Sequence, residues 1–321
     1  MTAFGYLLPT RELLMSQAVP DFRQILELAE RAEDLGFDSV WVGDSVLARP
    51  RFEPLTTLAA VAARTERVKL GTAVLIPALR QPVVLANEIA NLDHVAQGRL
   101  ILGLGIAAKS PSIAHEFAAC GVSMAHRVGL FEEGVTLMRR LWSEPELSFE
   151  GRYVHVQDVR LGLRPLQQPS PPLWLAGSVD NAFRRVLRLG DGWFPISPSP
   201  EAFAADWERL CSLGREMGRD AQALHRGLYT TLNIDENGDR AEQELRAFVE
   251  GYYGVPYEVQ ASRTGMCAGP AERCAQWLND FIAAGAQTIV VRFGGSDQLR
   301  QLERWVHEVR PRLQTVGSGS A

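Results

Sequence analysis

Short apolar runs alternate with longer amphipathic segments along most of the chain. Eight of these runs are five to eight residues long and rich in Val, Leu and Ile, which is typical of parallel strands buried on both faces. We expect a strand at each of them, over 3–8, 39–43, 68–75, 100–105, 173–177, 192–196, 227–234 and 288–293.

Between these runs, apolar residues recur at helical spacing. In the first such segment Ile25, Ala29 and Ala32 share one face, and Gly36 ends the pattern. The same periodicity predicts helices over 22–35, 55–64, 84–96, 128–142, 181–189, 202–217, 241–251, 271–284 and 298–309. Because strand and helix alternate eight times, the sequence predicts an α/β fold of the (β/α)8, or TIM, barrel type. A doubly wound sheet is the alternative, but its Gly-x-Gly-x-x-Gly motif is absent.

Three connections are longer than a minimal barrel needs, so we expect loop insertions after strands 4 and 7 and before strand 5. These connections span 107–126, 143–172 and 251–269. The first is expected to carry a short helix near 112–119, and the second a hairpin over 147–156. We expect one barrel domain over 1–312 and a flexible tail over 313–321, where Gly and Ser are frequent.

Charge and cysteine usage exclude several classes of partner. The net charge of −5 and a pI near 5.8 argue against nucleic acid or an anionic membrane surface as a partner. No apolar run reaches the roughly 18 residues that a membrane span needs, and the first residues lack the basic segment of a signal peptide. The four cysteines show no CxxC spacing, which is typical of reduced thiols in the cytoplasm, where we expect the protein to be.

The expected carboxyl ends of the strands, where barrels place their sites, are small, apolar and rich in glycine. Examples are Gly103-Leu-Gly105 and Ala176-Gly177. These ends lack the facing carboxylates of a glycosidase, the clustered ligands of a metal site and the well-placed lysine of a Schiff-base aldolase. Such a surface is suited to a flat aromatic cofactor that supplies the chemistry itself, and no metal is expected.

Three polar groups near these ends are each open to two interpretations. The turn Ala176-Gly177-Ser178 opens a helix, so it is either an anion site or an ordinary helix start capped by Ser178 or Asp180. Asp44 either bonds a cofactor ring or substrate, or closes the turn after its strand. Arg127 either reaches a phosphate or, as we favour, begins a solvated helix.

Several segments in the same order resemble the luciferase-like flavin-dependent oxidoreductases. They are 26–44, 58–74, 81–105, 177–195 and the last strand–helix unit beginning at Gly269, and the likeness runs from about 4 to 309. The resemblance implies a TIM barrel that holds a flavin at its carboxyl face and acts on a small organic substrate. Members use either reduced FMN for oxygenation or the deazaflavin coenzyme F420 for hydride transfer.

The resemblance also implies where the cofactor binds. A backbone bulge that supports the ring, often with a non-proline cis peptide, matches Ala73-Val74. The phosphate-binding segments match Ala176-Gly177-Ser178 and 105–107, and Asp44 matches a position that often faces the ring. With the residues considered above, the expected cofactor-binding set is Asp44, Ala73, Val74, Gly103, Gly105, Ile106, Ala107, Arg127, Ala176, Gly177 and Ser178.

This chain departs from the family at two places that bear on catalysis. Many members have histidine where this chain has Ser45, and polar residues where it has Ile106-Ala107-Ala108. The catalytic acid or base is therefore unassigned, with Asp44 as the candidate. We favour F420 over FMN because 44–51 together with 105–108 resembles the F420-dependent branch.

Partners and competing functions follow from the same comparison. The family likeness implies a homodimer and, if the cofactor is FMN, a flavin reductase partner. A non-catalytic flavin-binding or subunit-type barrel is the alternative function, because the usual histidine is missing. A phosphate-binding isomerase or aldolase barrel is a further alternative, weakened by the absence of a well-placed Lys, Glu or His.

Overall fold

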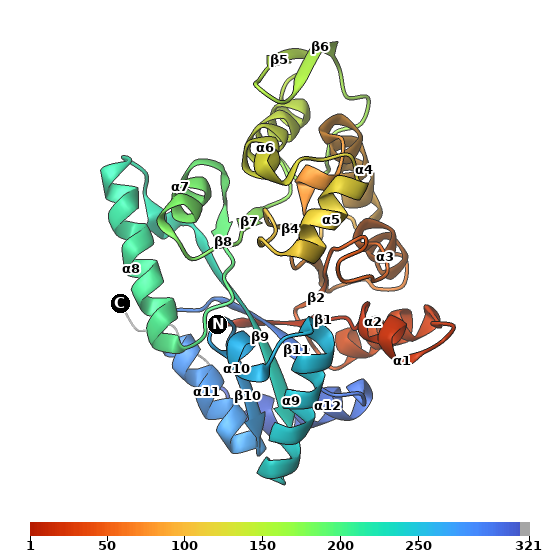
Figure 1. Ribbon diagram of the computed structural model, residues 1–321, viewed down its shortest axis with the longest axis vertical. Coiled ribbons are helices and arrows are strands. Elements are labelled where there is room, and N and C mark those ends of the chain that lie inside the picture. The colour runs from red at the N-terminus through yellow and green to blue at the C-terminus, as the bar shows by residue number, and fades with distance from the viewer. Residues whose placement is uncertain (315–321) are drawn as a thin grey trace.

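The protein is a closed barrel of eight parallel strands, described by a computed structural model over residues 1–314 (Figure 1). Each strand pairs in parallel with its neighbours, and β8 pairs with β9 to close the ring. The barrel strands are β1 (Ala3–Leu7), β2 (Ser39–Val42), β3 (Lys69–Thr72), β4 (Leu100–Leu104), β7 (Leu173–Leu175), β8 (Gly192–Trp193), β9 (His225–Ile234) and β11 (Thr288–Phe293). The predicted TIM barrel and all eight of its strands are confirmed.

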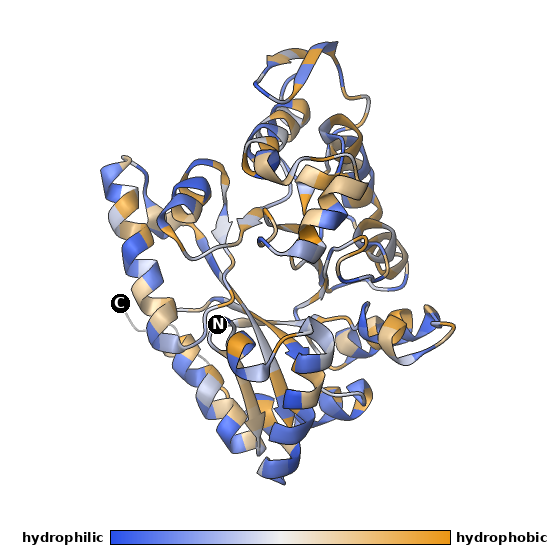
Figure 2. Cartoon of the chain, viewed as in Figure 1, coloured by the Kyte–Doolittle hydropathy of each residue, from blue (hydrophilic) through white to orange (hydrophobic). Residues whose placement is uncertain are grey.

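Helices surround the barrel, and Figure 2 shows that most of them carry both hydrophobic and hydrophilic residues. This is expected of helices that bury one face against a sheet and expose the other. They are α2 (Arg23–Asp34), α3 (Pro54–Ala62), α4 (Pro82–Val95), α6 (Arg127–Ser143), α7 (Asp180–Leu189), α8 (Pro200–Glu216), α9 (Gly238–Tyr253), α11 (Ala271–Ala283) and α12 (Gln298–Arg304). Each overlaps a predicted helical segment, with ends that differ by up to three residues, and after α12 the predicted segment continues as a π-helical turn, Trp305–Val309.

Large side chains fill the inside of the barrel. Trp41, Trp174 and Phe194 pack together with ring centroids 5.1 to 5.8 Å apart. Leu7, Ile101 and Val290 complete this inner cluster, and Ala73, Val74 and Tyr229 pack against it. The interior is therefore a packed core, and a ligand has access only at the two ends of the barrel.

The long connections contain the elements that shape one end of the barrel. The predicted short helix is α5 (Pro111–Ala119), and the predicted hairpin consists of β5 (Leu147–Glu150) and β6 (His155–Val159), beside α6 in Figure 1. Two further helices, α1 (Glu12–Ser16) and α10 (Tyr257–Ala261), were not predicted.

The predicted insertion over 251–269 ends in a strand that was not predicted. This is β10 (Met266–Gly269), which pairs in parallel with the outer half of β9, from Thr231 to Ile234. This strand has a neighbour on one side only and adds an edge outside the closed ring. Its four residues, Met-Cys-Ala-Gly, are too few to show an alternating pattern.

Two further predictions concern the ends of the chain and its cysteines. Over residues 1–314, no helix is both long and apolar enough to cross a membrane. All four cysteines are free thiols, as expected. Most of the predicted tail, 315–321, lies outside the described residues, and the single-domain assignment stays a prediction.

Candidate active site

A cavity of about 430 Å³ lies at the carboxyl end of the barrel. Its lining comes from the ends of β1, β2, β3, β4, β7 and β8, from Tyr229 on β9, and from the segments around α5, α9 and α10. This volume is in the range of ordinary small-molecule sites, and the position is the one that barrels use for function. Of the expected cofactor-binding residues, the structure brings Asp44, Ala73, Val74, Gly105, Ile106, Ala107, Ala176 and Gly177 together around it.

The floor of the cavity contains an unusual backbone feature after β3. The peptide bond between Ala73 and Val74 is cis, at the position that the family resemblance implied. A Cβ atom at Gly105 would lie 2.6 Å from Cγ2 of Val74, and one at Gly103 would lie 2.0 Å from the Thr72 carbonyl oxygen. Glycine is thus required at both positions because the segment after β3 packs closely against β4.

The turn after β7 forms a second wall of the cavity. Gly177 has a φ of +130°, and a Cβ atom there would lie 2.5 Å from Cβ of Ala182. Trp193 Nε1 donates to the Gly177 carbonyl oxygen at 2.8 Å and fixes the turn against β8. Helix α7 begins at Asp180 without a side-chain cap, so the interpretation in which Ser178 or Asp180 caps the helix is wrong.

The Asp44 carboxylate is engaged by protein groups. Arg80 Nη1 and Nη2 lie 2.6 and 3.1 Å from its two oxygens, and the Ile76 N–H donates to it at 2.9 Å. Its side chain is 1% exposed. Asp44 therefore connects the end of β2 to the segment after β3. This is close to the interpretation in which Asp44 closes a turn, but the turn follows β3 and not β2, the strand that Asp44 itself follows.

Glu116 on α5 is a buried carboxylate that sequence reasoning missed. It accepts hydrogen bonds from the Ser45 hydroxyl and from the N–H groups of Val46, Leu47 and Ala48, at 2.5 to 3.2 Å. Burial alone would raise the pKa of Glu116, but these hydrogen bonds outweigh it and hold the pKa below its ordinary value. Glu116 therefore stays ionised and fixes the loop after β2 as a wall of the cavity.

Sequence comparison identifies the class of barrel to which this site belongs. The family profile described as luciferase-like monooxygenase matches residues 2–291. The chain belongs to this family. It is therefore an enzyme of the luciferase-like oxidoreductase class, as the sequence predicted.

Relatives within the family match nearly the whole chain. It is 29% identical to the F420-dependent glucose-6-phosphate dehydrogenase of Amycolatopsis mediterranei, over 92% of this chain and 96% of the relative. It is 30% identical to the enzyme of the same name from Kineococcus radiotolerans, over 91% of this chain and 93% of the relative. The crystal structure of a monooxygenase from Streptomyces bottropensis is similar with a TM-score of 0.80, at 25% identity, covering 96% of this chain and 99% of that chain.

Three expected site residues do not line the cavity. Gly103 is buried inside the barrel. Ser178 is exposed and follows Gly177 in the sequence. Arg127 begins α6, where its Nη1 donates to the Met124 carbonyl oxygen at 3.2 Å; it is a helix start, but its Nε is buried, so it is not the solvated start that we favoured. For these three residues a cofactor contact stays a prediction.

Tyr229 is the most important cavity residue that the family pattern did not suggest. It lies on β9 and, like Ala73 and Val74, packs against the inner cluster of the barrel and lines the cavity. The guanidinium carbon of Arg292 lies 5.6 Å from its ring centroid. In the sequence Tyr229 sits within a predicted strand, and no local signal distinguished it from a core residue.

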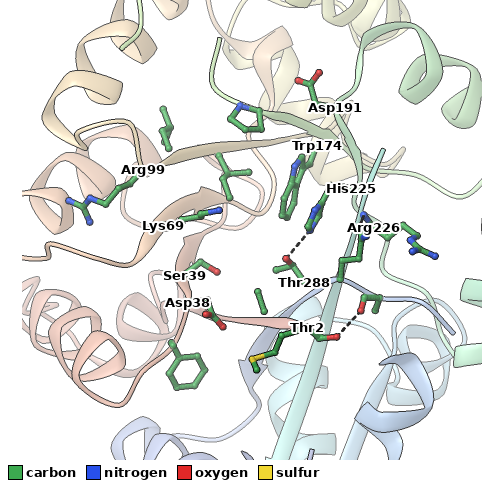
Figure 3. A pocket seen from close by; sticks show the side chains of 18 of the residues that line it. Thr2, Asp38, Ser39, Lys69, Arg99, Trp174, Asp191, His225, Arg226 and Thr288 are labelled. Atoms are coloured by element: carbon green, nitrogen blue, oxygen red, sulfur yellow. Dashed lines mark hydrogen bonds between the residues drawn. The ribbon is translucent and has the colours of Figure 1, made fainter. Parts of the chain in front are cut away.

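A larger cavity, of about 930 Å³, lies at the amino-terminal end of the barrel. Figure 3 shows Trp174 and His225 side by side within it, with ring centroids 4.3 Å apart, and Lys69 pointing toward them. His225 Nε2 lies 2.9 Å from the Thr288 hydroxyl. In barrels this end contributes to stability and the opposite end to catalysis, so we assign the active site to the smaller cavity.

His225 predicts a pH dependence of folding. Burial, Lys69 and Arg226 lower its pKa to about 4, whereas in an unfolded chain it takes up a proton near pH 6.5. Between these values the unfolded state binds more protons, so the free energy of unfolding falls as the pH drops, by on the order of 1–2 kcal/mol for this half-buried ring. Urea unfolding near neutral pH and near pH 4.5 measures the effect.

The matched variants for this prediction are His225→Gln and His155→Gln, the latter at an exposed position on β6. We expect the first to weaken the pH dependence and the second to leave it unchanged. An equal pH dependence in wild type and His225→Gln would contradict the assignment to His225.

Proposed function

We propose that the protein is an F420-dependent oxidoreductase that transfers a hydride between the deazaflavin and a small organic substrate. The observation that carries this proposal is the similarity, over 91% and 92% of the chain, to two enzymes named F420-dependent glucose-6-phosphate dehydrogenase. The cavity at the carboxyl end of the barrel supports it, because its glycine-rich side is suited to a flat ring.

The residues present fit such a cofactor. Ala73 and Val74 would support the ring from below, and 105–107 would form the wall beside it. Gly177, whose backbone conformation excludes most side chains, lies where a phosphate would meet the uncapped start of α7. When bound, the oxidised deazaflavin would accept a hydride from the substrate and the reduced form would donate one.

Among the three tyrosines that line the cavity, Tyr229, Tyr252 and Tyr253, Tyr229 lies on a barrel strand. Among the described lining residues, the carboxylates Asp44 and Glu116 are both engaged by protein donors. Burial raises the pKa of Tyr229 well above its ordinary value and outweighs the nearby Arg292. We therefore propose that the Tyr229 hydroxyl donates a hydrogen bond to the substrate oxygen and, in the direction of substrate reduction, a proton, and we assign Asp44 a structural role.

Tyr229→Phe is expected to lower kcat about 100-fold, at the low end of the effect of general acid catalysis. The dissociation constant of F420 should change by less than about threefold, because the ring and its packing remain. Steady-state kinetics and a binding titration of the same variant separate the two effects. Tyr153→Phe, away from the cavity, is the control, and an unchanged kcat in Tyr229→Phe would remove Tyr229 from the chemistry.

The proposed activity is tested with oxidised F420 and a panel of alcohols and sugar phosphates, including glucose 6-phosphate, the substrate named for the relatives. Loss of F420 fluorescence without oxygen is the expected result. The alternative function is oxygenation with reduced FMN. The similarity to the Streptomyces bottropensis monooxygenase supports this alternative. Oxygen-dependent turnover with FMN, together with no reaction of F420, would favour that alternative.

The assembly and location of the protein are also proposals. The family resemblance supports a homodimer, with a flavin reductase as partner only if FMN is used, and the four free cysteines support a cytoplasmic location. A subunit-type barrel without activity is the competing function. Sedimentation of the purified protein distinguishes a dimer from a monomer, and F420 binding without any turnover in the presence of a tight partner would support the subunit-type barrel.

A further inference from the structure

Five arginines gather at one side of the cavity, and we call them the arginine wall: Arg11, Arg49, Arg51, Arg263 and Arg292. They come from the segments after β1 and β2, from the segment after α10, and from β11. Arg49, Arg51 and Arg263 line the cavity directly. Segments far apart in the sequence thus place positive charge at the same side of the site.

Two tyrosines at the end of α9 contact four of the five arginines. The guanidinium carbons of Arg11, Arg51 and Arg292 lie 5.1, 5.9 and 4.5 Å from the ring centroid of Tyr252. That of Arg49 lies 5.0 Å from the ring of Tyr253. These aromatic faces hold the cations in place but do not neutralise their charge.

Arg292 is the most deeply buried of the five. It is 1% exposed and lies behind Tyr229, Tyr252 and Tyr253. Its Nη2 donates to the Thr231 hydroxyl at 3.0 Å, whereas its Nε and Nη1 atoms have no hydrogen-bond partner among residues 1–314. A buried guanidinium without a carboxylate is costly, because buried charges are normally paired.

Within the described part of the chain, no member of the wall forms an ion pair. Arginines elsewhere do so, as Arg240 and Arg300 show by binding Asp235. Glu12 is the acidic residue beside the wall, and burial raises its pKa despite Arg292. The two carboxylates that line the cavity, Asp44 and Glu116, are already engaged, so the wall keeps an excess of positive charge.

The wall also has a fixed geometry. A Cβ atom at Gly43, at the end of β2, would lie 2.0 Å from Nη1 of Arg51, so glycine there allows the guanidinium to lie against the strand end. Arg51 Nε donates to the Arg49 carbonyl oxygen at 3.1 Å. An arrangement of cations held in place before binding is what recognition of an oxyanion requires.

We propose that the arginine wall binds an anionic oxygen group of the substrate, a carboxylate or a phosphate, and so selects anionic over neutral substrates. This inference rests on the proposed function, because it concerns the substrate of the same cavity. The other possible source of the anion is the cofactor itself. We favour the substrate because the cofactor's phosphate is assigned to the turn at Gly177, after β7, whereas the wall comes from the segments after β1, β2 and α10 and from β11.

The test uses the full-length protein and inorganic phosphate as the probe. Thermal stabilisation by phosphate is measured against chloride at equal ionic strength, first without F420 and then with saturating F420. The variant is the double substitution Arg49→Ala and Arg263→Ala, at positions that are half-exposed and exposed. The control is Arg215→Ala, an exposed arginine on α8 outside the cavity.

We expect phosphate to stabilise the wild type and the control, and its dissociation constant to rise at least roughly tenfold in the double variant. Stabilisation should persist when F420 is saturating. Equal phosphate affinity in wild type and double variant, or no stabilisation at all, would overturn the proposal. Loss of phosphate binding on saturation with F420 would assign the wall to the cofactor and would equally overturn it.

Failure of this inference is distinguishable from failure of the proposed function. If F420 does not bind at all, the proposed function fails, while the measurements without F420 still report on the wall. If F420 binds and phosphate does not, the cofactor assignment stands and the arginine wall is not an anion site.

Discussion

Replacement of Ala176 by tryptophan is expected to weaken F420 binding by at least 100-fold. Ala176 lies beside Gly177 on the cavity wall and is half-buried. An indole at this position would extend into a cavity of about 430 Å³ and take the space that the ring and phosphate need. A loss of that size corresponds to about 2.7 kcal/mol of binding free energy.

Fluorescence titration of the variant with F420 measures this effect. Ala176→Ser is the control, because it keeps the small volume and should bind within a few-fold of wild type. The melting temperature of Ala176→Trp should change little, since the added side chain points into open space. If Ala176→Trp binds F420 as tightly as the wild type, the cofactor is not in this cavity.

Removal of Arg80 is expected to lower the free energy of unfolding by about 3–5 kcal/mol, the range for an unpaired buried charge. Arg80→Ala would leave the Asp44 carboxylate, which is 1% exposed, without its bidentate partner. The N–H of Ile76 alone cannot balance this charge, and the segment after β3 would lose its tie to β2. Denaturant unfolding measures the loss.

The exposed ion pair between Arg64 and Glu30 provides the comparison. Arg64→Ala should cost less than about 1 kcal/mol, as surface pairs usually do. The double variant Arg80→Ala and Asp44→Asn should recover much of the stability that Arg80→Ala loses, because no buried charge remains unpaired. A loss below about 1 kcal/mol in Arg80→Ala would show that Asp44 does not depend on this pair.

The fold was predictable because the signals are repeated and local. Each barrel strand is an apolar run, and each helix has an apolar stripe that ends near a glycine or a polar cap, as in α2 before Gly36. Strand β10 was missed because it is short and pairs on one side only. The short helices α1 and α10 were missed because five residues do not establish a helical period.

The sequence predicted site residues only at positions where the backbone conformation or close packing requires a particular residue type, such as glycine. Gly105 and Gly177 are glycines for steric reasons, and the bulge at Ala73-Val74 followed from the family resemblance. Glu116 binds a loop about 70 positions away along the chain, and Arg292 meets tyrosines from two other elements. Such contacts form only when the barrel closes, so no local sequence pattern predicts them.

The sequence also could not assign the ionic partner of Asp44. Asp44 and Arg80 are 36 positions apart, and Arg80 follows a 3-10 turn, Pro77–Leu79, that the apolar pattern did not predict. Asp44 was the candidate catalytic group because the sequence predicted its position at the end of β2 but gave no sign of its ion pair with Arg80. Our proposal therefore moves from Asp44 to Tyr229, which lines the cavity.

The central claim is that this cavity binds the deazaflavin F420. The most direct test is a pair of equilibrium titrations of the purified wild-type protein with oxidised F420 and with FMN, followed by fluorescence and by thermal unfolding. A ligand at 100 times its dissociation constant should stabilise the folded protein by about 2.7 kcal/mol. We expect saturable binding and stabilisation by F420 and a much weaker effect of FMN. Binding of FMN alone, or of neither compound, would contradict the account.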